Sequence, residues 1–225
     1  MSALSQRLEQ LQARLATACA RASRPRDQVK LVAVSKLHPA SAIEEAYALG
    51  LRDFGENYAQ ELRDKAKQLA ALAGLRWHAI GPVQPKNAKY VAAAAAVFHA
   101  LESLDVATEL NRRRTGPPLE VLIEVNLAGE ASKAGLAPEA VKPLADQLGG
   151  LKNVKLVGLT SMPPLVDNAE LNRPHFRALK KLAGEMGLLE LSMGTTADFE
   201  VAIEEGATLV RVGTALFGER PTSAP

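Results

Sequence analysis

Eight short apolar segments recur along the chain, and most are followed by a stretch of helical character. They are rich in Val, Ile and Leu without a clean alternation of apolar and polar residues, which is typical of strands covered on both faces. The predicted strands are 29–36, 52–57, 76–81, 97–102, 119–126, 154–161, 188–193 and 208–213. The stretches predicted to be helical are 40–49, 58–72, 85–95, 103–113, 138–148, 171–186 and 197–205. This alternation predicts a parallel sheet with helices packed on it.

Eight strands that alternate with helices within 225 residues fit a single-domain (β/α)8 TIM barrel at the short end of its usual size. A doubly wound open sheet is the alternative for the same alternation. The glycine fingerprint G-x-G-x-x-G, which a dinucleotide-binding open sheet carries after its first strand, does not follow residues 29–36. The chain also has no composition break, long linker or internal repeat, so we expect one domain over residues 1–225.

A further helix is predicted over residues 1–24, ahead of the first strand. Leucines recur in it at helical spacing, at Leu4, Leu8, Leu11 and Leu15. The arginines beside them are also typical of an organellar transit peptide, but Glu9 departs from the acid-poor composition of such a segment. We therefore expect this helix to pack on the barrel. Cys19 lies in the same helix and is predicted to be a packed thiol.

The balance of charges argues against a polyanionic partner. The chain has 27 basic and 25 acidic residues, which gives a formal net charge of +2. Its densest basic cluster, Arg112-Arg113-Arg114, stands at a predicted helix end, where cations complement the helix dipole, and no aromatic residues interleave with it. We therefore expect small-molecule partners and no nucleic acid.

The lack of a long apolar stretch and of a second cysteine indicates the cellular location to expect for the protein. No stretch approaches the roughly 18 consecutive apolar residues that a membrane-spanning helix needs, so no membrane partner is expected. A single cysteine cannot form an internal disulfide, which fits a reducing compartment such as the cytoplasm. Nothing in the sequence demands a dimer, and we expect a monomer.

A lysine stands at the end of the first predicted strand, where Ser35-Lys36 is followed by His38-Pro39. Proline bars the strand from continuing and is well tolerated in the first turn of a helix. An amine at such a junction, partly removed from water, loses proton affinity and becomes nucleophilic near neutral pH. The alternative is a lysine that extends from the strand end into solvent.

Two glycine-containing loops follow the seventh and eighth predicted strands, at Ser192-Met193-Gly194-Thr195-Thr196 and Arg211-Val212-Gly213-Thr214. In TIM barrels the loops at these two positions frequently bind phosphate. Glycine lets backbone N–H groups approach an anion closely, hydroxyl groups follow, and the first loop leads into a helix whose N-terminus favours negative charge. The alternative is a pair of ordinary tight turns.

Arg211 lies within the eighth predicted strand, and its side chain must face either the helix layer or the barrel interior. A buried guanidinium needs hydrogen-bond acceptors, which a nearby acid can supply. Closure of a barrel places the eighth strand beside the first, which brings Lys36 and the two loops within about 10 Å of each other. A lysine for a Schiff base, an arginine for a pyridine nitrogen and a phosphate pocket are the parts of a pyridoxal 5′-phosphate (PLP) site.

Blocks of sequence from about Val29 to Arg220 carry a family resemblance. They are Ala33-Val34-Ser35-Lys36, Phe54-Gly55-Glu56-Asn57-Tyr58 with Gln60-Glu61, Trp77-His78 with Ile80-Gly81-Pro82, Val125-Asn126, Ser132-Lys133 with Gly135, Leu191-Ser192-Met193-Gly194, and Val210-Arg211-Val212-Gly213-Thr214-Ala215 with Phe217-Gly218. In this order the blocks resemble the family of pyridoxal phosphate homeostasis proteins. The family fold is similar to the barrel domain of bacterial alanine racemase, as a single domain with an extra N-terminal helix.

The resemblance implies a role for several residues. Lys36 holds PLP as a Schiff base, and Arg211 faces the pyridine nitrogen. Asn57 and His78 line the pocket, although His78 taken by itself is equally well explained by a hydrogen bond within the core. The phosphate is held by residues of the two glycine-containing loops, namely Ser192, Gly194, Thr195, Thr196, Gly213 and Thr214.

The sequence departs from the family pattern at three places. In Lys86-Asn87 the usual order of asparagine and lysine is exchanged, and His38 stands where a second lysine is frequent. Gly194-Thr195-Thr196 replaces the usual Gly-Met-Ser, which keeps a hydroxyl group for the phosphate.

Two functions compete for this chain. The first is a non-enzymatic carrier that masks the aldehyde of PLP and releases the cofactor to other proteins, with apo-PLP enzymes as recipients. The second is a racemase-like enzyme that acts on amino acids. Arginine cannot accept a proton, so it leaves the pyridine nitrogen unprotonated and weakens the cofactor as an electron sink. Tyr58 is the only tyrosine expected near the pocket, with a packing role as its alternative, and we therefore favour the carrier.

Lys133 lies in a glycine-flanked loop after the fifth predicted strand, over residues 129–135. It is a candidate second lysine that receives PLP from Lys36 or stabilises it by its charge. The alternative is a solvated loop lysine. No pair of histidines has the spacing of metal ligands and no cysteine supports one, so no metal is expected.

Overall fold

The computed structural model describes residues 2–129 and 134–219. Within these residues, eight parallel strands close into a barrel in chain order, and β8 pairs with β1. The strands are β1 (Lys30–Val34), β2 (Asp53–Glu56), β3 (Arg76–Ala79), β4 (Val97–Leu101), β5 (Leu119–Glu124), β6 (Val154–Thr160), β7 (Glu190–Ser192) and β8 (Leu209–Val212). The predicted (β/α)8 barrel is therefore confirmed, and the open-sheet alternative is wrong.

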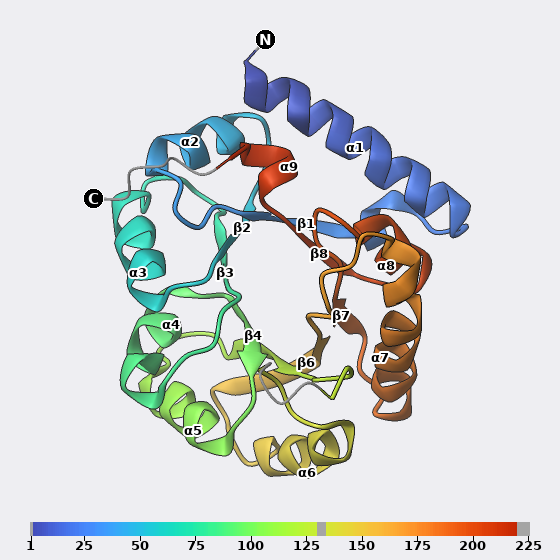
Figure 1. Ribbon diagram of the computed structural model, residues 1–225. Helices are drawn as coiled ribbons and strands as arrows, with labels where there is room; N and C mark the ends of the chain where they lie inside the picture. The colour runs from blue at the N-terminus through green and yellow to red at the C-terminus, as the bar shows by residue number, and fades with distance from the viewer. Residues whose placement is uncertain (1, 130–133, 220–225) are drawn as a thin grey trace.

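The helices form a ring outside the strands, as Figure 1 shows in a view along the barrel. They are α1 (Ala3–Arg21), α2 (Ala40–Ala48), α3 (Ala59–Gln68), α4 (Ala88–Ala94), α5 (Leu104–Arg113), α6 (Pro138–Leu148), α7 (Arg173–Glu185), α8 (Phe199–Glu204) and α9 (Thr214–Phe217). Short 3₁₀ segments are η1 (Arg26–Gln28), η2 (Pro85–Asn87) and η3 (Ala169–Asn172).

Apolar side chains fill two separate cores, because the strands are covered on both faces. The outer core between sheet and helices includes the largest fully buried side chains, Phe54, Phe98, Phe176 and Phe199. The inner core, inside the barrel, is a cluster of Val32, Val97, Leu122 and Leu209. Buried polar side chains share the barrel interior with this small cluster, and several of them belong to the site described below.

α1 packs across the outside of the barrel against α8 and α9 (Figure 1). Its leucines and the thiol of Cys19 are buried in the outer core. Arg7 donates hydrogen bonds to the carbonyl oxygens of Leu216, at 2.8 Å, and Phe217, at 3.2 Å, in α9. A cation at the last carbonyls of a helix satisfies them and complements the helix dipole. The predicted packed N-terminal helix is confirmed.

The structure differs from the sequence prediction mainly at the ends of elements. β1 ends at Val34, so Lys36 lies in the turn that follows the strand and not at its last position. The sequence reasoning missed α9, which begins directly after Gly213. Four residues are too few to display a helical period, so no pattern in the sequence distinguishes this helix from a loop.

Candidate functional site

A cavity of about 510 Å³ lies at the carboxyl ends of the strands, within the size range of small-molecule sites. Seven of the predicted site residues line it, namely Lys36, Asn57, Thr195, Thr196, Arg211, Gly213 and Thr214. The barrel therefore brings the lysine after β1 together with the loops after β7 and β8. His78, Ser192 and Gly194 do not belong to its lining, and Lys133 lies outside the described residues.

A buried ion cluster holds the backbone on both sides of Lys36. The ammonium group of Lys65 donates to the carboxylates of Glu56, at 2.8 Å, and Glu61, at 2.7 Å, and to the carbonyl oxygen of Ser35, at 2.8 Å. These three acceptors satisfy its three donors. The Ser35 hydroxyl donates to Glu56, and the Leu37 N–H donates to Glu61, each at 2.7 Å. Both neighbours of Lys36 are thus tied to the same cluster.

Backbone strain accompanies this cluster at the site lysine. Leu37 has φ +64°, a left-handed conformation that costs a residue other than glycine free energy. Its N–H is held by Glu61, and its side chain is 41% exposed, so no packing of the side chain explains the conformation. The bonds of the ion cluster to Ser35 and Leu37 hold the backbone in this strained turn.

Glu56 is the most deeply buried carboxylate of this cluster, with 1% of the residue exposed. Burial raises its pKa to about 7, and the opposing effects of Lys65 and of the Ser35 hydroxyl do not compensate fully. Its Oε2 atom has no hydrogen-bond partner among the described residues. This oxygen is therefore a buried polar atom that no described residue satisfies.

The loop after β8 forms one wall of the cavity. A Cβ atom added at Gly213 would lie 3.2 Å from the carbonyl oxygen of Val34, so the glycine allows β8 and β1 to approach each other closely. Gly213 precedes α9, whose first N–H groups have no partner within the helix. Gly213 and Thr214 both line the cavity, which places these donors at its edge.

The loop after β7 is organised by Asp198. This carboxylate accepts hydrogen bonds from the N–H of Thr195, at 2.7 Å, and from its hydroxyl, at 3.1 Å. The Asn172 side-chain amide donates to the second carboxylate oxygen at 2.9 Å. The polar groups of Thr195 are therefore engaged within the loop, whereas the Thr196 hydroxyl has no partner among the described residues and remains available in the cavity.

Gly194 is required by the packing of the loop after β7. It has φ +89°, and an added Cβ atom would lie 2.5 Å from Cβ of Ala202 and 2.9 Å from Cα of Phe199. The residue makes room for α8, and it does not line the cavity. Packing therefore explains the glycine, and its contact with a phosphate stays a prediction.

Arg211 is buried, and its guanidinium group is held by oxygen atoms of the neighbouring strands. It donates to the Thr160 hydroxyl and to the Ser192 carbonyl, each at 2.8 Å, and to the Ser161 carbonyl at 3.0 Å. The Ser192 hydroxyl also accepts from it. The predicted phosphate role of Ser192 is therefore corrected, because its hydroxyl lies in the barrel interior on Arg211.

Arg211 has no direct ion pair with an acidic side chain of residues 2–129 or 134–219. Burial lowers its pKa to about 10, against the opposing influence of Glu124 and Asp198, so the group stays charged at neutral pH. The alternative interpretation, in which Arg211 pairs directly with an acidic side chain, is therefore wrong for the described residues. Its Nε–H has no acceptor among the described residues and is the part of the guanidinium left to a ligand.

His78 lies in the barrel core and not in the cavity. Its ring bonds to the carboxylate of Asp53, at 2.9 Å, and to the ring of His99, at 2.8 Å, and only 1% of the residue is exposed. The pocket role implied by the resemblance is therefore corrected, and the core hydrogen bond is what the structure has.

Glu124 lines the cavity and escaped the sequence reasoning. The residue is 8% exposed, and burial raises its pKa, with Arg211 opposing and Glu102 reinforcing that effect. A signal for it was available, because Glu120 and Glu124 interrupt an otherwise apolar strand at even spacing. A carboxylate at the carboxyl end of a barrel strand is a typical functional position.

The departures from the family pattern lie beside the cavity. Lys86 and Asn87 line a neighbouring groove together with Tyr58, whose side chain is exposed and does not line the main cavity. The ring of His38 packs on Phe217 with a centroid distance of 5.2 Å. His38 thus links the turn of Lys36 to α9 through a ring contact with Phe217, which a lysine at position 38 would not make.

Two further searches concern the described residues only. None of their helices combines the length and the apolar character required to cross a bilayer. No three or more of their His, Cys, Asp and Glu side chains gather in an arrangement that would hold a metal ion.

Comparison with known proteins gives consistent relatives over the whole chain. The family profile described as "Alanine racemase, N-terminal domain" matches residues 6–221. The chain is 43% identical to the pyridoxal phosphate homeostasis protein of Pseudomonas aeruginosa, over 100% of this chain and 99% of that protein. It is 37% identical to the protein of the same name from Escherichia coli K12, over 99% of each chain.

Solved structures include similar chains at two levels of likeness. PipY of Synechococcus elongatus PCC7942, solved with and without PLP, is 35% identical with a TM-score of 0.83, over 96% of this chain and 100% of PipY. An alanine racemase of Clostridium difficile 630 is 14% identical with a TM-score of 0.68, over 87% of this chain and 54% of the racemase. The second likeness concerns the fold alone.

Proposed function

Because the chain belongs to the family of pyridoxal phosphate homeostasis proteins, we propose that it binds PLP in the cavity at the carboxyl ends of the strands and serves PLP homeostasis. It holds the cofactor on Lys36 and releases it to other proteins. When bound, PLP supplies an aldehyde that bonds to an amine and an aromatic ring that attracts electrons.

One observation carries this proposal: Lys36, Arg211 and residues of the loops after β7 and β8 line a single cavity. The donor set fits PLP, since it offers an amine for the aldehyde, a charge-bearing N–H for the pyridine nitrogen, and hydroxyl and backbone groups for the phosphate. Thr196, Gly213 and Thr214 are the residues best placed to bind the phosphate, because the polar groups of Thr195 are engaged by Asp198.

The residues around the cofactor favour binding over catalysis. Arg211 only donates hydrogen bonds, so it stabilises an unprotonated pyridine nitrogen. None of the described residues that line the cavity is a tyrosine, and Glu124 is the acidic group in it. We therefore propose a carrier, with a racemase-like enzyme that uses Glu124 as its acid or base as the alternative.

The proposal also includes the cellular location, the oligomeric state and the recipients of the cofactor. We place the protein in the cytoplasm as a monomer of one domain over residues 1–225, with apo-PLP enzymes as recipients. Lys133, if it takes part, serves as a second amine for the departing cofactor.

The binding step is tested with the visible absorption spectrum of the protein after addition of PLP, followed by borohydride reduction and peptide mapping. Lys36→Ala is compared with Lys86→Ala, which removes an amine from the neighbouring groove and not from the cavity. We expect a cofactor band and an adduct on Lys36 in the parent and in Lys86→Ala. An adduct elsewhere, or a band that survives Lys36→Ala unchanged, would contradict the proposal.

Release and catalysis are separated by a second pair of measurements. The PLP-loaded protein is mixed with an apo-PLP enzyme, and the activity recovered by that enzyme is followed over time. The same loaded protein is incubated with L-alanine, and formation of D-alanine is measured. Recovery without racemisation supports the carrier, whereas racemisation that Glu124→Gln abolishes would establish the enzyme.

A further inference from the structure

A continuous chain of hydrogen-bonded polar side chains crosses the barrel interior from the cavity to the opposite end. It begins at Arg211 in β8, which donates to the Ser192 hydroxyl at the end of β7. That hydroxyl lies 2.8 Å from Nδ1 of His99 in β4, whose Nε2 lies 2.8 Å from Nδ1 of His78 in β3. Nε2 of His78 lies 2.9 Å from Asp53, the first residue of β2.

The two ends of this chain determine the direction of every hydrogen bond within it. Arg211 can only donate, so the Ser192 oxygen accepts from it. An ionised Asp53 can only accept, so Nε2 of His78 donates to it, and Nδ1 of a neutral His78 accepts from His99. Nδ1 of His99 is then left to accept the hydrogen of the Ser192 hydroxyl. A neutral His99 then carries its proton on Nε2 and donates to His78, which in turn donates from Nε2 to Asp53. The reverse arrangement would leave an unprotonated Nε2 of His78 facing a carboxylate at 2.9 Å with no hydrogen between them.

Both rings are neutral in this arrangement, as their surroundings require. Burial lowers the pKa of His78 and lowers that of His99 well below its ordinary value, with His78 and Arg211 adding to the second effect. Partial burial raises the pKa of Asp53. The hydrogen bond from His78 and the charges of Arg76 and Lys30 lower it by more, so the pKa of Asp53 lies below its ordinary value. A cation and an anion thus stand at the two ends of a polarised neutral chain.

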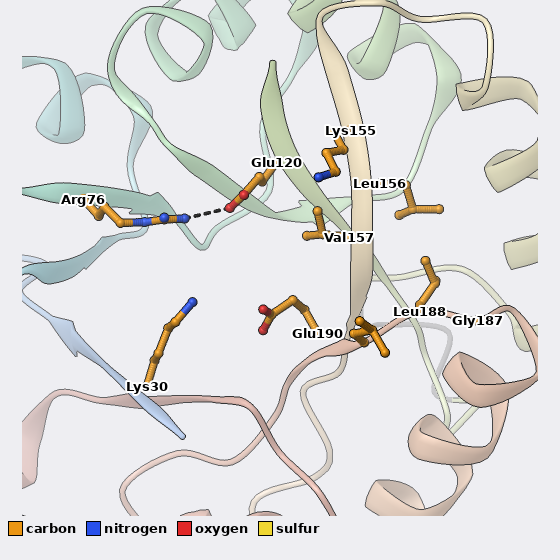
Figure 2. A pocket seen from close by; sticks show the side chains of 10 residues that line it. Lys30, Arg76, Glu120, Lys155, Leu156, Val157, Gly187, Leu188 and Glu190 are labelled. Carbon is orange, nitrogen blue, oxygen red and sulfur yellow. Dashed lines mark hydrogen bonds and ion pairs between the residues drawn. The ribbon is translucent and has the colours of Figure 1, made fainter. Parts of the chain in front are cut away.

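The Asp53 end reaches the amino ends of the strands, where a second cavity of about 340 Å³ opens (Figure 2). Asp53 is 22% exposed on its side chain, and Nε of Arg76 lies 3.6 Å from its carboxylate. Arg76 also pairs with Glu120 at 2.7 Å, and Lys30 extends toward the same space (Figure 2). The remaining charged groups that line this cavity are Lys155 and Glu190.

We propose that Asp53, His78 and His99 are positioning residues for Arg211 and act on it through the Ser192 hydroxyl. Asp53 fixes the proton arrangement of the two rings, so the Ser192 hydrogen points to His99 and its lone pairs face the guanidinium. The guanidinium is thereby held in one orientation with Nε–H left for a ligand. This inference rests on the proposed function, since Arg211 is the group expected to face the pyridine nitrogen of PLP.

The first test needs no cofactor. Long-range proton–nitrogen NMR spectra identify which ring nitrogen of each histidine is protonated. At pH 7 we expect His78 and His99 to be neutral with the proton on Nε2, and the Nη hydrogens of Arg211 to be resolved because the group does not rotate freely. A proton on Nδ1 of His99, or a positively charged ring at either position, would overturn the proposal.

The second test removes the charge that sets the direction. In Asp53→Asn the amide can offer either a donor or an acceptor to His78, so both proton arrangements become accessible. We expect mixed tautomers at His78 and His99 and averaged Arg211 hydrogens. Glu120→Gln is the matched control, because Glu120 also pairs with Arg76 but has no hydrogen bond to Asp53, His78, His99 or Ser192. We expect its spectra to match the parent's.

The cofactor is then added to the same proteins. We expect Asp53→Asn to bind PLP up to about tenfold less tightly, the scale of one misplaced hydrogen bond, and to shift the absorption maximum of the bound cofactor. Mixed tautomers with unchanged affinity and spectrum, or a Glu120→Gln protein that behaves like Asp53→Asn, would contradict the proposal. Failure of the parent to bind PLP would contradict the proposed function and leave the NMR test of the chain intact.

Discussion

The ammonium group of Lys65 lies 2.8 Å from the carbonyl oxygen of Ser35, the residue that precedes the site lysine. The same amine bonds to Glu56 and Glu61, and Glu61 in turn accepts from the N–H of Leu37. Lys65 of α3 thus helps to fix the backbone conformation of the turn that contains Lys36. The site lysine stands in a strained turn because this ion cluster holds the backbone on both of its sides.

Lys65→Met is expected to destabilise the protein and to weaken PLP retention together. Removal of one partner from a buried ion cluster costs about 3 kcal/mol or more, and the carbonyl of Ser35 loses its donor. Urea unfolding gives the free energy, and dialysis of the PLP-loaded protein gives retention. Lys67→Met in the same helix is the control, because Lys67 is exposed. Equal stability of the two variants would refute the role of the cluster.

The stability of the protein should carry a pH signature from Glu56. Its pKa is about 7 in the folded protein against an ordinary value of 4.5, so the folded state binds more protons between these values. The contribution of Glu56 to the unfolding free energy is therefore full below pH 4.5 and falls by about 3 kcal/mol as the pH rises to 7.

This signature is isolated by comparing the parent with Glu56→Gln, which remains neutral. The other titratable groups are common to both proteins, so their contributions cancel in the difference. Urea unfolding at pH 5 and pH 8 is expected to give a parent-minus-variant difference that decreases with pH. A difference that stays the same between pH 5 and pH 8 would mean that Glu56 is ionised throughout this range.

Gly194→Ala is expected to destabilise the fold by about 2 kcal/mol or more. The new methyl group meets Ala202 at 2.5 Å, and φ of +89° is unfavourable for alanine. Thermal unfolding measures the effect. Gly184→Ala in α7 is the control, because nothing lies within 4 Å of its added Cβ atom, and helix propensity predicts a gain of about 0.5–1 kcal/mol. A stable Gly194→Ala protein with lost phosphate binding would instead restore the anion role predicted from the sequence.

Arg7→Ala is expected to weaken PLP retention, because Arg7 holds α9 and α9 carries Thr214, a residue proposed to bind the phosphate. The loss of two hydrogen bonds to Leu216 and Phe217 costs about 1–2 kcal/mol, and α9 carries Thr214 at the cavity edge. PLP retention by dialysis should fall relative to Arg21→Ala, which removes an exposed ion pair of the same helix with Glu204. Unchanged retention would show that α1 contributes stability alone.

The barrel and the position of Lys36 were accessible from the sequence because they depend on local patterns. Apolar runs predict strands, apolar spacing predicts helices, and a proline marks the end of the first strand. Each of these patterns is contained in a short window of sequence. The glycine-containing loops after β7 and β8 were likewise found by their place in the order of elements. Chain order is sufficient here, since a (β/α)8 barrel places its strands side by side in sequence order.

The partners of the buried polar groups were decided only by the tertiary structure. His99 meets Ser192 across 93 residues of sequence, and Arg211 meets Thr160 across 51. Whether a polar side chain lines the cavity or bonds inside the barrel depends on its depth along a strand and on groups from other strands. No sequence pattern encodes such a distance. The sequence alone therefore predicted the barrel, which the structure confirms, and Lys36 as a candidate site lysine, which lines the cavity. Only closure of the barrel showed that His78, Ser192 and Gly194 do not line that cavity.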